Sequence, residues 1–265
     1  MKETILLLSD DTLSKVKIIK GELISYQKNG VEYMHQKEDK GWNSSDTEMF
    51  PVIGATIKNN HIVSTEKGHA VLDQHGLLRE FDYKMIDYNQ KTAVFEKKYI
   101  KNTHLENRKY PNKSLEEYVY WPYDFSFEKK FILTNDALEI TFEITSEKGM
   151  PYMLGYHPAF KLGGLSKETL FTDSKKITLQ DVFDAEINTL PLLNCNKLIL
   201  HHSEKKGVKI NTKGFNHFML WTEVNNMICI EPITHFPELR TQNYSEKNMN
   251  SNSGKDCFSV TISIL

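Results

Sequence analysis

The chain has 265 residues, which is enough to bury a large core, and one all-β domain is an ordinary outcome at this length. Its 33 Lys and Arg residues nearly balance 35 Asp and Glu residues, for a formal charge of −2, and the two signs are interspersed along the chain. The lack of a basic block argues against nucleic acid as a partner, and we expect a single domain over residues 1–265.

The first apolar segment is too short to direct the chain into or across a membrane. It runs only from Ile5 to Leu8 before Ser9, whereas a signal peptide needs about 7–15 apolar residues and a membrane span about 20. The three cysteines are widely spaced and odd in number, which is typical of reduced thiols. We therefore expect a soluble, cytoplasmic protein without a membrane partner.

Short runs of alternating apolar and polar residues predict β-strands along most of the chain. In chain order, we expect strands at residues 22–27, 31–35, 92–100, 124–128, 138–145, 152–156, 208–211, 218–222, 227–231 and 258–264. No sustained 3.6-residue pattern, the mark of an amphipathic helix, competes with them.

The clearest pair of strands lies in the middle of the chain. From Leu138 to Thr145 every second residue is apolar, and Phe125 and Phe127 begin the same pattern before the turn at residues 134–136. These two runs predict an antiparallel hairpin with one buried face. Many short antiparallel strands without intervening helices indicate an all-β sandwich or barrel.

Glu231 stands where one predicted strand ends. It follows the apolar run at residues 227–230 and precedes Pro232, which has no N–H for a sheet and favours extended geometry in the residue before it. The strand is therefore expected to end at the Glu231 carboxylate, which could act there as a general base. The alternative is an ordinary strand-end glutamate that faces water.

Two histidines occupy comparable positions. His157 precedes Pro158 at the end of another predicted strand, and an imidazole transfers protons readily near neutral pH. The alternative for His157 is a hydrogen-bonded structural residue. His75 precedes Gly76, which predicts a tight turn that presents the ring to a cleft. The alternative for His75 is a turn histidine in solvent.

Four short strings resemble one protein family. The F-P-x-x-G string begins at Phe50, the Q-H-G string at Gln74, the G-x-H-P-x-F string at Gly155 and the I-C-I-E-P string at Ile228. In this order and approximate spacing they resemble the motifs of the aldose 1-epimerase family, part of the galactose mutarotase-like superfamily. The resemblance is strongest to the LacX-like bacterial branch, and it spans residues 50–232.

The resemblance implies a fold, a reaction and a set of residues. The fold is a large antiparallel β-sandwich, the galactose mutarotase-like supersandwich, with a sugar cleft. The reaction is the interconversion of the anomers of an aldose by acid/base ring opening, without a metal ion or a redox cofactor. Matching the motifs makes Glu231 the general base and His157 the general acid. Substrate binding would fall to His75, Gln74, Asn196 and Trp221.

Aromatic side chains suit the apolar face of a sugar ring. Trp42, Trp121, Tyr123 and Trp221 are available for this contact, and core packing is the alternative for each of them. Asn196 is the nearest match to an aspartate that relatives often carry before an apolar strand.

Two arginines of the family pattern are missing, because Ala55 follows the F-P-x-x-G string and Gln74 stands at the arginine of R-H-G. Mutarotation of a free aldose is the leading hypothesis, with a bell-shaped pH profile whose acid limb reports Glu231 and whose alkaline limb reports His157. A hexose-phosphate epimerase needs a cationic pocket for the phosphate group, and the loss of both arginines argues against such a pocket. The same losses favour the remaining alternative, a noncatalytic sugar-binding or sensing protein.

Overall fold

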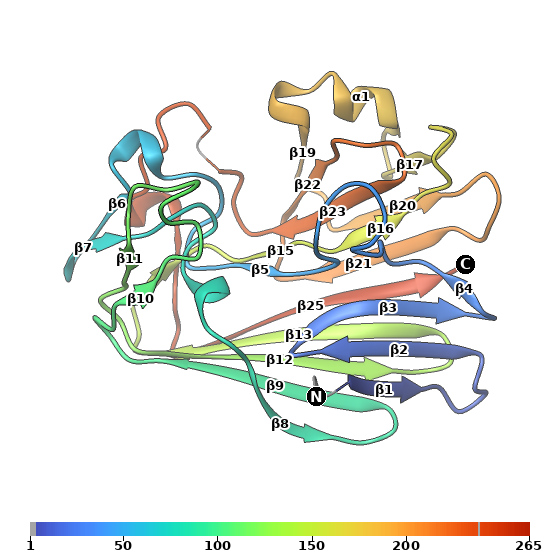
Figure 1. The fold of residues 1–265 in the computed structure, drawn as a ribbon, viewed down its shortest axis with the longest axis horizontal. Coiled ribbons are helices and arrows are strands. Elements are labelled where there is room, and N and C mark those ends of the chain that lie inside the picture. Colours follow the sequence, from blue (N-terminus) through green and yellow to red (C-terminus); the bar gives the residue numbers. More distant parts are fainter. Residues whose placement is uncertain (1–3, 238) are drawn as a thin grey trace.

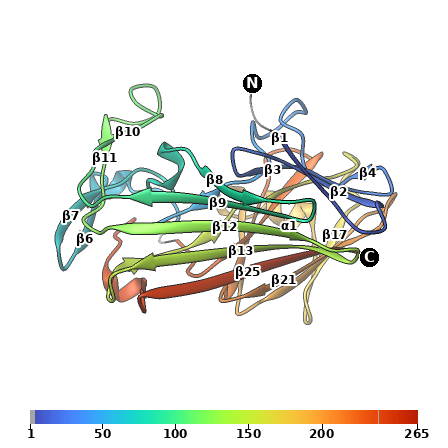
Figure 2. The ribbon, with the colours of Figure 1, turned by 90° about the horizontal axis from the view of Figure 1, so that it is seen from below.

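The alternating runs in the middle of the chain form the centre of a large sheet in the computed structural model, which describes residues 4–237 and 239–265. Among these residues the sheet has nine antiparallel strands in the order β18-β17-β20-β21-β25-β13-β12-β9-β8. Figure 2 shows β9, β12, β13 and β25 side by side. The bounds are Lys176–Thr178 (β18), Thr169–Phe171 (β17), Lys197–His201 (β20), Val208–Lys213 (β21), Lys255–Ile264 (β25), Ala137–Ser146 (β13), Phe125–Leu133 (β12), Thr92–Tyr99 (β9) and Lys84–Tyr88 (β8).

A second antiparallel sheet lies over the large sheet (Figure 1). Within the described residues its strands follow the order β19-β22-β23-β15-β5, and β16 also pairs with β23. The bounds are Thr189–Leu193 (β19), His217–Trp221 (β22), Met227–Ile233 (β23), Gly155–Tyr156 (β15), Glu48–Met49 (β5) and Ala159–Lys161 (β16). The chain is out of strand conformation only at His157 and Pro158 between β15 and β16.

Smaller elements surround the two sheets. One further sheet contains β1 (Thr4–Leu8), β2 (Ser14–Ile19), β3 (Glu22–Lys28) and β4 (Val31–Glu32). Three strand pairs are β6 (Ile62–Thr65) with β7 (Gly68–Val71), β10 (Leu105–Glu106) with β11 (Tyr118–Val119), and β14 (Pro151–Tyr152) with β24 (Asn250–Ser251). The helical segments are α1 (Leu179–Phe183) and the 3₁₀ turns Ile57–Asn59, Leu78–Glu80, Glu186–Asn188 and Glu246–Asn248. In the described ranges, no helix has the length and apolar character needed to cross a membrane.

Aromatic side chains fill the space between the large sheet and the second sheet. Phe127 and Phe142 project from the inner faces of β12 and β13, with ring centroids 5.5 Å from Phe50 and 5.1 Å from Tyr156, respectively. All four rings are fully buried. Because each ring of this size stabilises the fold by roughly 1.5–3 kcal/mol when it leaves water, this layer holds the two sheets together.

Three charged side chains are buried in the same layer. Lys129 on β12 has its Nζ 2.8 Å from Oδ2 of Asp46 and 2.6 Å from Oε1 of Glu48 on β5. The hydroxyl of Tyr156 donates to the same Asp46 oxygen over 2.8 Å. We refer to Lys129, Asp46 and Glu48 as the buried ion cluster. Since each is at most 3% exposed, their charges are compensated by one another and not by water.

The expected all-β class, with antiparallel sheets packed face to face, is confirmed. The predicted central hairpin is also confirmed, because β12 and β13 pair with Leu133 opposite Leu138, and buried residues alternate along both strands. The predicted C-terminal strand is β25, which lies on the other side of β13. The predicted strand at residues 152–156 is instead split into β14 and β15.

The prediction that the strand at residues 227–231 stops before Pro232 is wrong, because β23 continues to Ile233. On one side of β23 the N–H groups of Ile230 and Thr234 both donate to carbonyl groups of the neighbouring segment. Pro232 lies between them on that side. Its missing N–H therefore removes one bond of the ladder, while the bonds on either side hold the strand in place.

Candidate active site

The register of three strands brings His157 and Glu231 together. β15 and β16 both run antiparallel to β23, with Gly155 paired with Ile233 and Ala159 paired with Cys229. The residue midway along one side must face the residue midway along the other, and these two residues are His157 and Glu231. Nε2 of His157 accordingly lies 3.3 Å from Oε1 of Glu231.

The contact between these two side chains leaves hydrogen-bonding capacity unused. The side chain of His157 is 10% exposed and that of Glu231 is 0% exposed. Among the described residues, both carboxylate oxygens of Glu231 lack a hydrogen-bond partner, and so does Nδ1 of His157. Because buried polar groups are normally paired, a ligand that carries hydroxyl groups would meet acceptors already in position.

His157 is held in place by the backbone and by two indole rings. Its N–H donates to the carbonyl oxygen of Thr47 over 2.8 Å. Its ring centroid lies 4.5 Å from that of Trp42 and 5.9 Å from that of Trp221. Both tryptophans are half-buried, so part of each indole remains accessible to a ligand beside His157.

The predicted tight turn at His75 is confirmed. His75 and Gly76 have φ of 70° and 79°, and a Cβ on Gly76 would lie 2.1 Å from the carbonyl oxygen of Phe50, so only glycine fits there. The ring centroid of His75 lies 6.1 Å from that of His157. Nδ1 of His75 accepts the N–H of Gly54 over 3.1 Å, and this bond assigns the ring proton to Nε2.

Gln74 lies beside that ring proton. Its side-chain amide is 3.3 Å from Nε2 of His75. Because Nε2 is a donor in this tautomer, the amide must present its oxygen and not its nitrogen. Gln74 is exposed, so its side chain can rotate away when a ligand takes the proton of His75.

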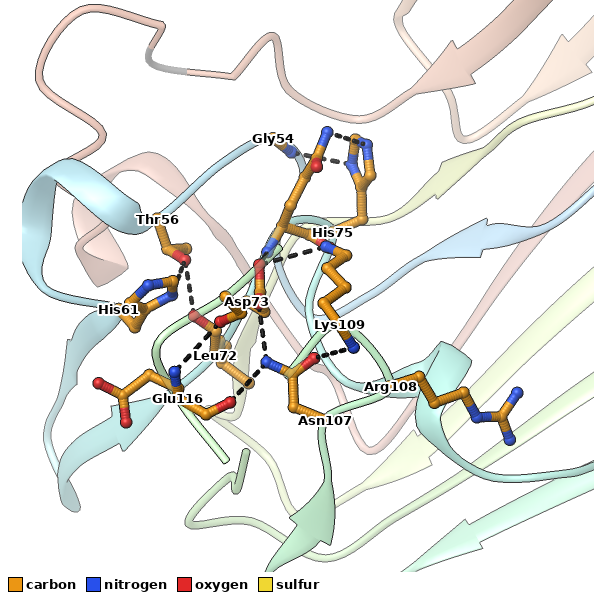
Figure 3. Close-up of polar contacts among 12 residues, drawn as sticks. Gly54, Thr56, His61, Leu72, Asp73, His75, Asn107, Arg108, Lys109 and Glu116 are labelled. Atoms are coloured by element: carbon orange, nitrogen blue, oxygen red, sulfur yellow. Dashed lines mark hydrogen bonds and ion pairs between the residues drawn. The ribbon is translucent and has the colours of Figure 1, made fainter. Parts of the chain in front are cut away.

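Asp73 anchors the turn that carries His75, as Figure 3 shows. Its carboxylate accepts a hydrogen bond from Nδ2 of Asn107 over 2.8 Å. It also forms an ion pair with Nζ of Lys109 at 3.2 Å. Burial alone would raise the pKa of Asp73, but hydrogen bonds from Ser114, Asn107 and Gln74 outweigh it and lower the pKa to about 2. The carboxylate is therefore charged throughout the physiological range and holds the turn against the loop at residues 107–116.

Arg79 brings a cation to the site that the sequence motifs did not predict. The 3₁₀ turn Leu78–Glu80 directs its side chain toward β5, where its Nε donates to the carbonyl oxygen of Glu48 over 2.9 Å. Its Nη2 is buried and without a partner in the described part of the chain. The sequence contains three arginines among 33 basic residues. The sequence did hold a signal for Arg79 as a site residue: it lies four residues after His75 and directly after two leucines.

Burial determines where the protons of the central pair reside. It raises the pKa of Glu231 well above its usual value, although Arg79 acts in the opposite direction. Burial, together with Arg79, lowers the pKa of His157 to about 3. Between these two pKa values the pair holds one proton, on the carboxyl group of Glu231, and the His157 ring is neutral. Burial also lowers the pKa of His75, so this ring is neutral as well.

The remaining predicted residues lie elsewhere. Asn196 is exposed in the turn between β19 and β20, where its backbone carbonyl oxygen accepts a hydrogen bond from the N–H of Thr212 over 2.9 Å. It lines a surface cavity of about 130 Å³ together with Cys195 and Asp173. Trp121 and Tyr123 are buried in the core. Of the residues named from the sequence, those that come together are Glu231, His157, His75, Gln74, Trp42 and Trp221.

Comparisons with known proteins bear on the family and on the fold. A sequence model of the family described as aldose 1-epimerase matches residues 6–223. The plasmid form of protein LacX from Lactococcus lactis subsp. lactis is 22% identical over 262 residues, with 82% of each chain covered. A solved structure described as a galactose mutarotase related enzyme, from Lactobacillus acidophilus, has a TM-score of 0.80 at 18% identity and covers 99% of this chain and 97% of its own. A galactose mutarotase-like protein from Lactobacillus casei has a TM-score of 0.77 at 18% identity, with 99% and 100% covered. The fold is that of the galactose mutarotase-like proteins.

Proposed function

Because the chain belongs to the aldose 1-epimerase family, we propose that it interconverts the α and β anomers of a free aldose. The observation that carries the proposal is the buried pair of His157 and Glu231, whose Nε2 and Oε1 atoms are 3.3 Å apart. A carboxyl group and an imidazole in this arrangement are the two groups that acid/base opening of a hemiacetal requires.

The reaction moves two protons and breaks one bond. A base takes the proton of the C1 hydroxyl while an acid protonates the ring oxygen, so the bond between C1 and the ring oxygen breaks and an open-chain aldehyde forms. Rotation about the C1–C2 bond presents the other face of the aldehyde, and the reverse transfers close the ring to the other anomer. Glu231 as the base and His157 as the acid balance these transfers, because the pair holds one proton before and after each step.

The productive form of the pair differs from the resting form in the position of one proton. Burial favours the proton on Glu231 and a neutral His157 ring, whereas the reaction starts from a carboxylate and an imidazolium. Arg79 favours the carboxylate but also disfavours the imidazolium. Hydrogen bonds donated by sugar hydroxyls to Glu231 therefore supply the remaining stabilisation that moves the proton to His157.

The surrounding side chains fit the two kinds of surface that a sugar presents. Trp42 and Trp221, on either side of His157, offer apolar faces to the C–H groups of the ring. Nε2 of His75 and Nη2 of Arg79, which has no partner among the described residues, offer donors to its oxygen atoms. In this proposal Gln74 gives up its contact with His75 when a sugar hydroxyl replaces it.

Polarimetry tests the proposal directly. Several freshly dissolved aldoses are followed to anomeric equilibrium with and without the protein, at equal pH and buffer concentration. We expect a faster approach to the same end point for at least one aldose. Equal rates for every sugar would contradict catalysis.

A noncatalytic sugar-binding protein is the second candidate, and the complete burial of Glu231, which raises the pKa of its carboxyl group, is the observation that favours it. If the sugar does not draw the carboxyl proton to His157, the site binds without turnover. Sugar titration combined with polarimetry separates the two, because this candidate predicts binding without acceleration.

A hexose phosphate fits this site less well. The negative charges of Glu231 and Glu48 both favour the protonated form of Arg79. Lys109 is paired with Asp73. Carboxylates already compensate the charge of each cation, so neither offers the uncompensated positive charge that a phosphate dianion requires, although Nη2 of Arg79 can still donate to a neutral hydroxyl.

A further inference from the structure

A third side chain with metal-binding chemistry lies beside the central pair and takes no part in the proposed proton transfers. Cys229 precedes Glu231 by two residues on β23, so both side chains project from the same face of the strand. Its thiol is fully buried. It packs with Ala159 against Trp42 and Trp221 and forms part of the floor beneath the two indole rings.

The donor atoms of these three side chains are spaced closely enough for one metal ion. One ring nitrogen of His157, Sγ of Cys229 and one carboxylate oxygen of Glu231 all lie within 4.8 Å of one another. Tetrahedral zinc, with bonds of about 2.0–2.3 Å, places neighbouring ligand atoms roughly 3.3–3.8 Å apart. The spacing of 3.3 Å between His157 and Glu231 already fits. The widest spacing has to close by about 1 Å, which a small rotation of the Cys229 or Glu231 side chain supplies.

The hydrogen bonding of the same atoms points independently to a ligand. Glu231 is completely buried, and both of its carboxylate oxygens lack a hydrogen-bond partner in the described ranges. One nitrogen, one sulfur and one oxygen from three side chains form a typical zinc donor set, and they leave the fourth tetrahedral position open.

We propose that His157, Cys229 and Glu231 bind a thiophilic divalent cation such as Zn²⁺ at the centre of the cleft. The bound ion would occupy the atoms that the proposed function assigns to the general acid and the general base. The ion therefore stops proton transfer through these two side chains. This inhibitory effect rests on the proposed function, whereas the binding of the ion does not.

The donor atoms make the site selective among cations. The guanidinium of Arg79 acts electrostatically on both Cys229 and Glu231, so it opposes every divalent cation alike and only one with strong bonds to these ligands can bind. Mg²⁺ and Ca²⁺ bind through several oxygen ligands and would find a single carboxylate here. Zn²⁺ also forms bonds to sulfur and to imidazole nitrogen, so it binds where the two harder cations do not.

Binding is measured with the metal alone. Protein freed of metal by a chelator and then desalted is titrated with Co²⁺, whose bond to a thiolate produces a charge-transfer absorption band, and Zn²⁺ is then added as a competitor. We expect one equivalent of Co²⁺, the thiolate band and displacement by Zn²⁺. Cys229→Ala should lose the band and weaken Zn²⁺ binding by more than roughly 100-fold, because it removes a direct ligand.

Matched cysteine variants show which thiol binds. Cys195 is half-buried and Cys257 is exposed, so a double variant, Cys195→Ala with Cys257→Ala, should keep the band and the stoichiometry. Cys229→Val, which fills more of the space than alanine, serves if Cys229→Ala does not fold. A band that survives in the Cys229 variants, or equal binding of Mg²⁺, would overturn the proposal. Zinc binding through Cys229 in a protein that never accelerates mutarotation would leave the metal site standing and remove the proposed function.

Discussion

At the scale of single residues, burial reverses the order in which the central pair loses its protons. The sequence motifs predict an acid limb from Glu231 and an alkaline limb from His157. In the structure burial lowers the pKa of His157 to about 3 and raises that of Glu231 well above its usual value. We therefore expect the acid limb to report His157 and the alkaline limb to report Glu231, while the pair still holds one proton in between.

The pH profile of kcat/KM tests this order through Arg79. Arg79 lowers the pKa of both Glu231 and His157, so Arg79→Met should raise both pKa values and move both limbs to higher pH. The measurement is mutarotase rate against pH, with a chelator present to keep the site free of metal. Limbs that stay in place, or that move to lower pH, would contradict this electrostatic role.

Glu231→Gln separates catalysis from binding. The amide keeps the shape of the side chain but cannot accept the proton of the C1 hydroxyl, so turnover should fall by roughly 100-fold or more while sugar still binds. Polarimetry gives the first quantity and sugar titration the second. His75→Asn is the comparison, because loss of a binding histidine should raise KM as well. Full activity in Glu231→Gln would show that another group is the base.

At the scale of elements, the turn at residues 73–76 holds His75 through the backbone. Gly76→Ala puts a Cβ into the carbonyl oxygen of Phe50 and should lower the free energy of unfolding by about 2 kcal/mol or more, with loss of sugar binding. Gly30→Ala is the matched control, since Gly30 has a similar φ of 76° and open space around it. Urea unfolding of both variants measures the difference. Equal losses would mean that the contact with Phe50 is unimportant.

Much of the fold could be predicted from local patterns, and much of the site from short motifs. The alternation at residues 138–145 depends only on one buried face, so it predicts β13 well. The end of β23 could not be predicted, because whether Pro232 interrupts a ladder depends on the neighbouring segment. The approach of His157 to Glu231 and the return of Arg79 toward β5 both depend on strand pairing, which local sequence does not encode.

At the scale of the whole molecule, the buried ion cluster connects the large sheet with the second sheet. Lys129→Met removes the cation that contacts both Asp46 and Glu48, leaving only the weaker electrostatic action of Lys97 and Arg79 on Glu48, and should cost about 3–5 kcal/mol of the free energy of unfolding. Chemical denaturation is the measurement. Lys130→Met is the control, because Lys130 is half-buried on the opposite face of β12 and should change stability by roughly 0.5 kcal/mol or less.

A rescue variant distinguishes charge from volume at Lys129. Adding Asp46→Asn and Glu48→Gln to Lys129→Met removes the uncompensated charges and should restore most of the lost stability. A triple variant no more stable than Lys129→Met would indicate that the lysine acts by packing.

The single domain expected over residues 1–265 stays a prediction.

The placement of His157 opposite Glu231 is a matter of counting, since the pairings of Gly155 and Ala159 with β23 leave room for three residues and no more, with His157 in the middle. One residue inserted or deleted in this interval would turn the histidine to the other face of the sheet. Substitutions leave the count intact. In descendants of this chain we therefore expect drift in composition between β15 and β16 but a constant length, so that the evolutionary barrier here is to indels and not to point mutations.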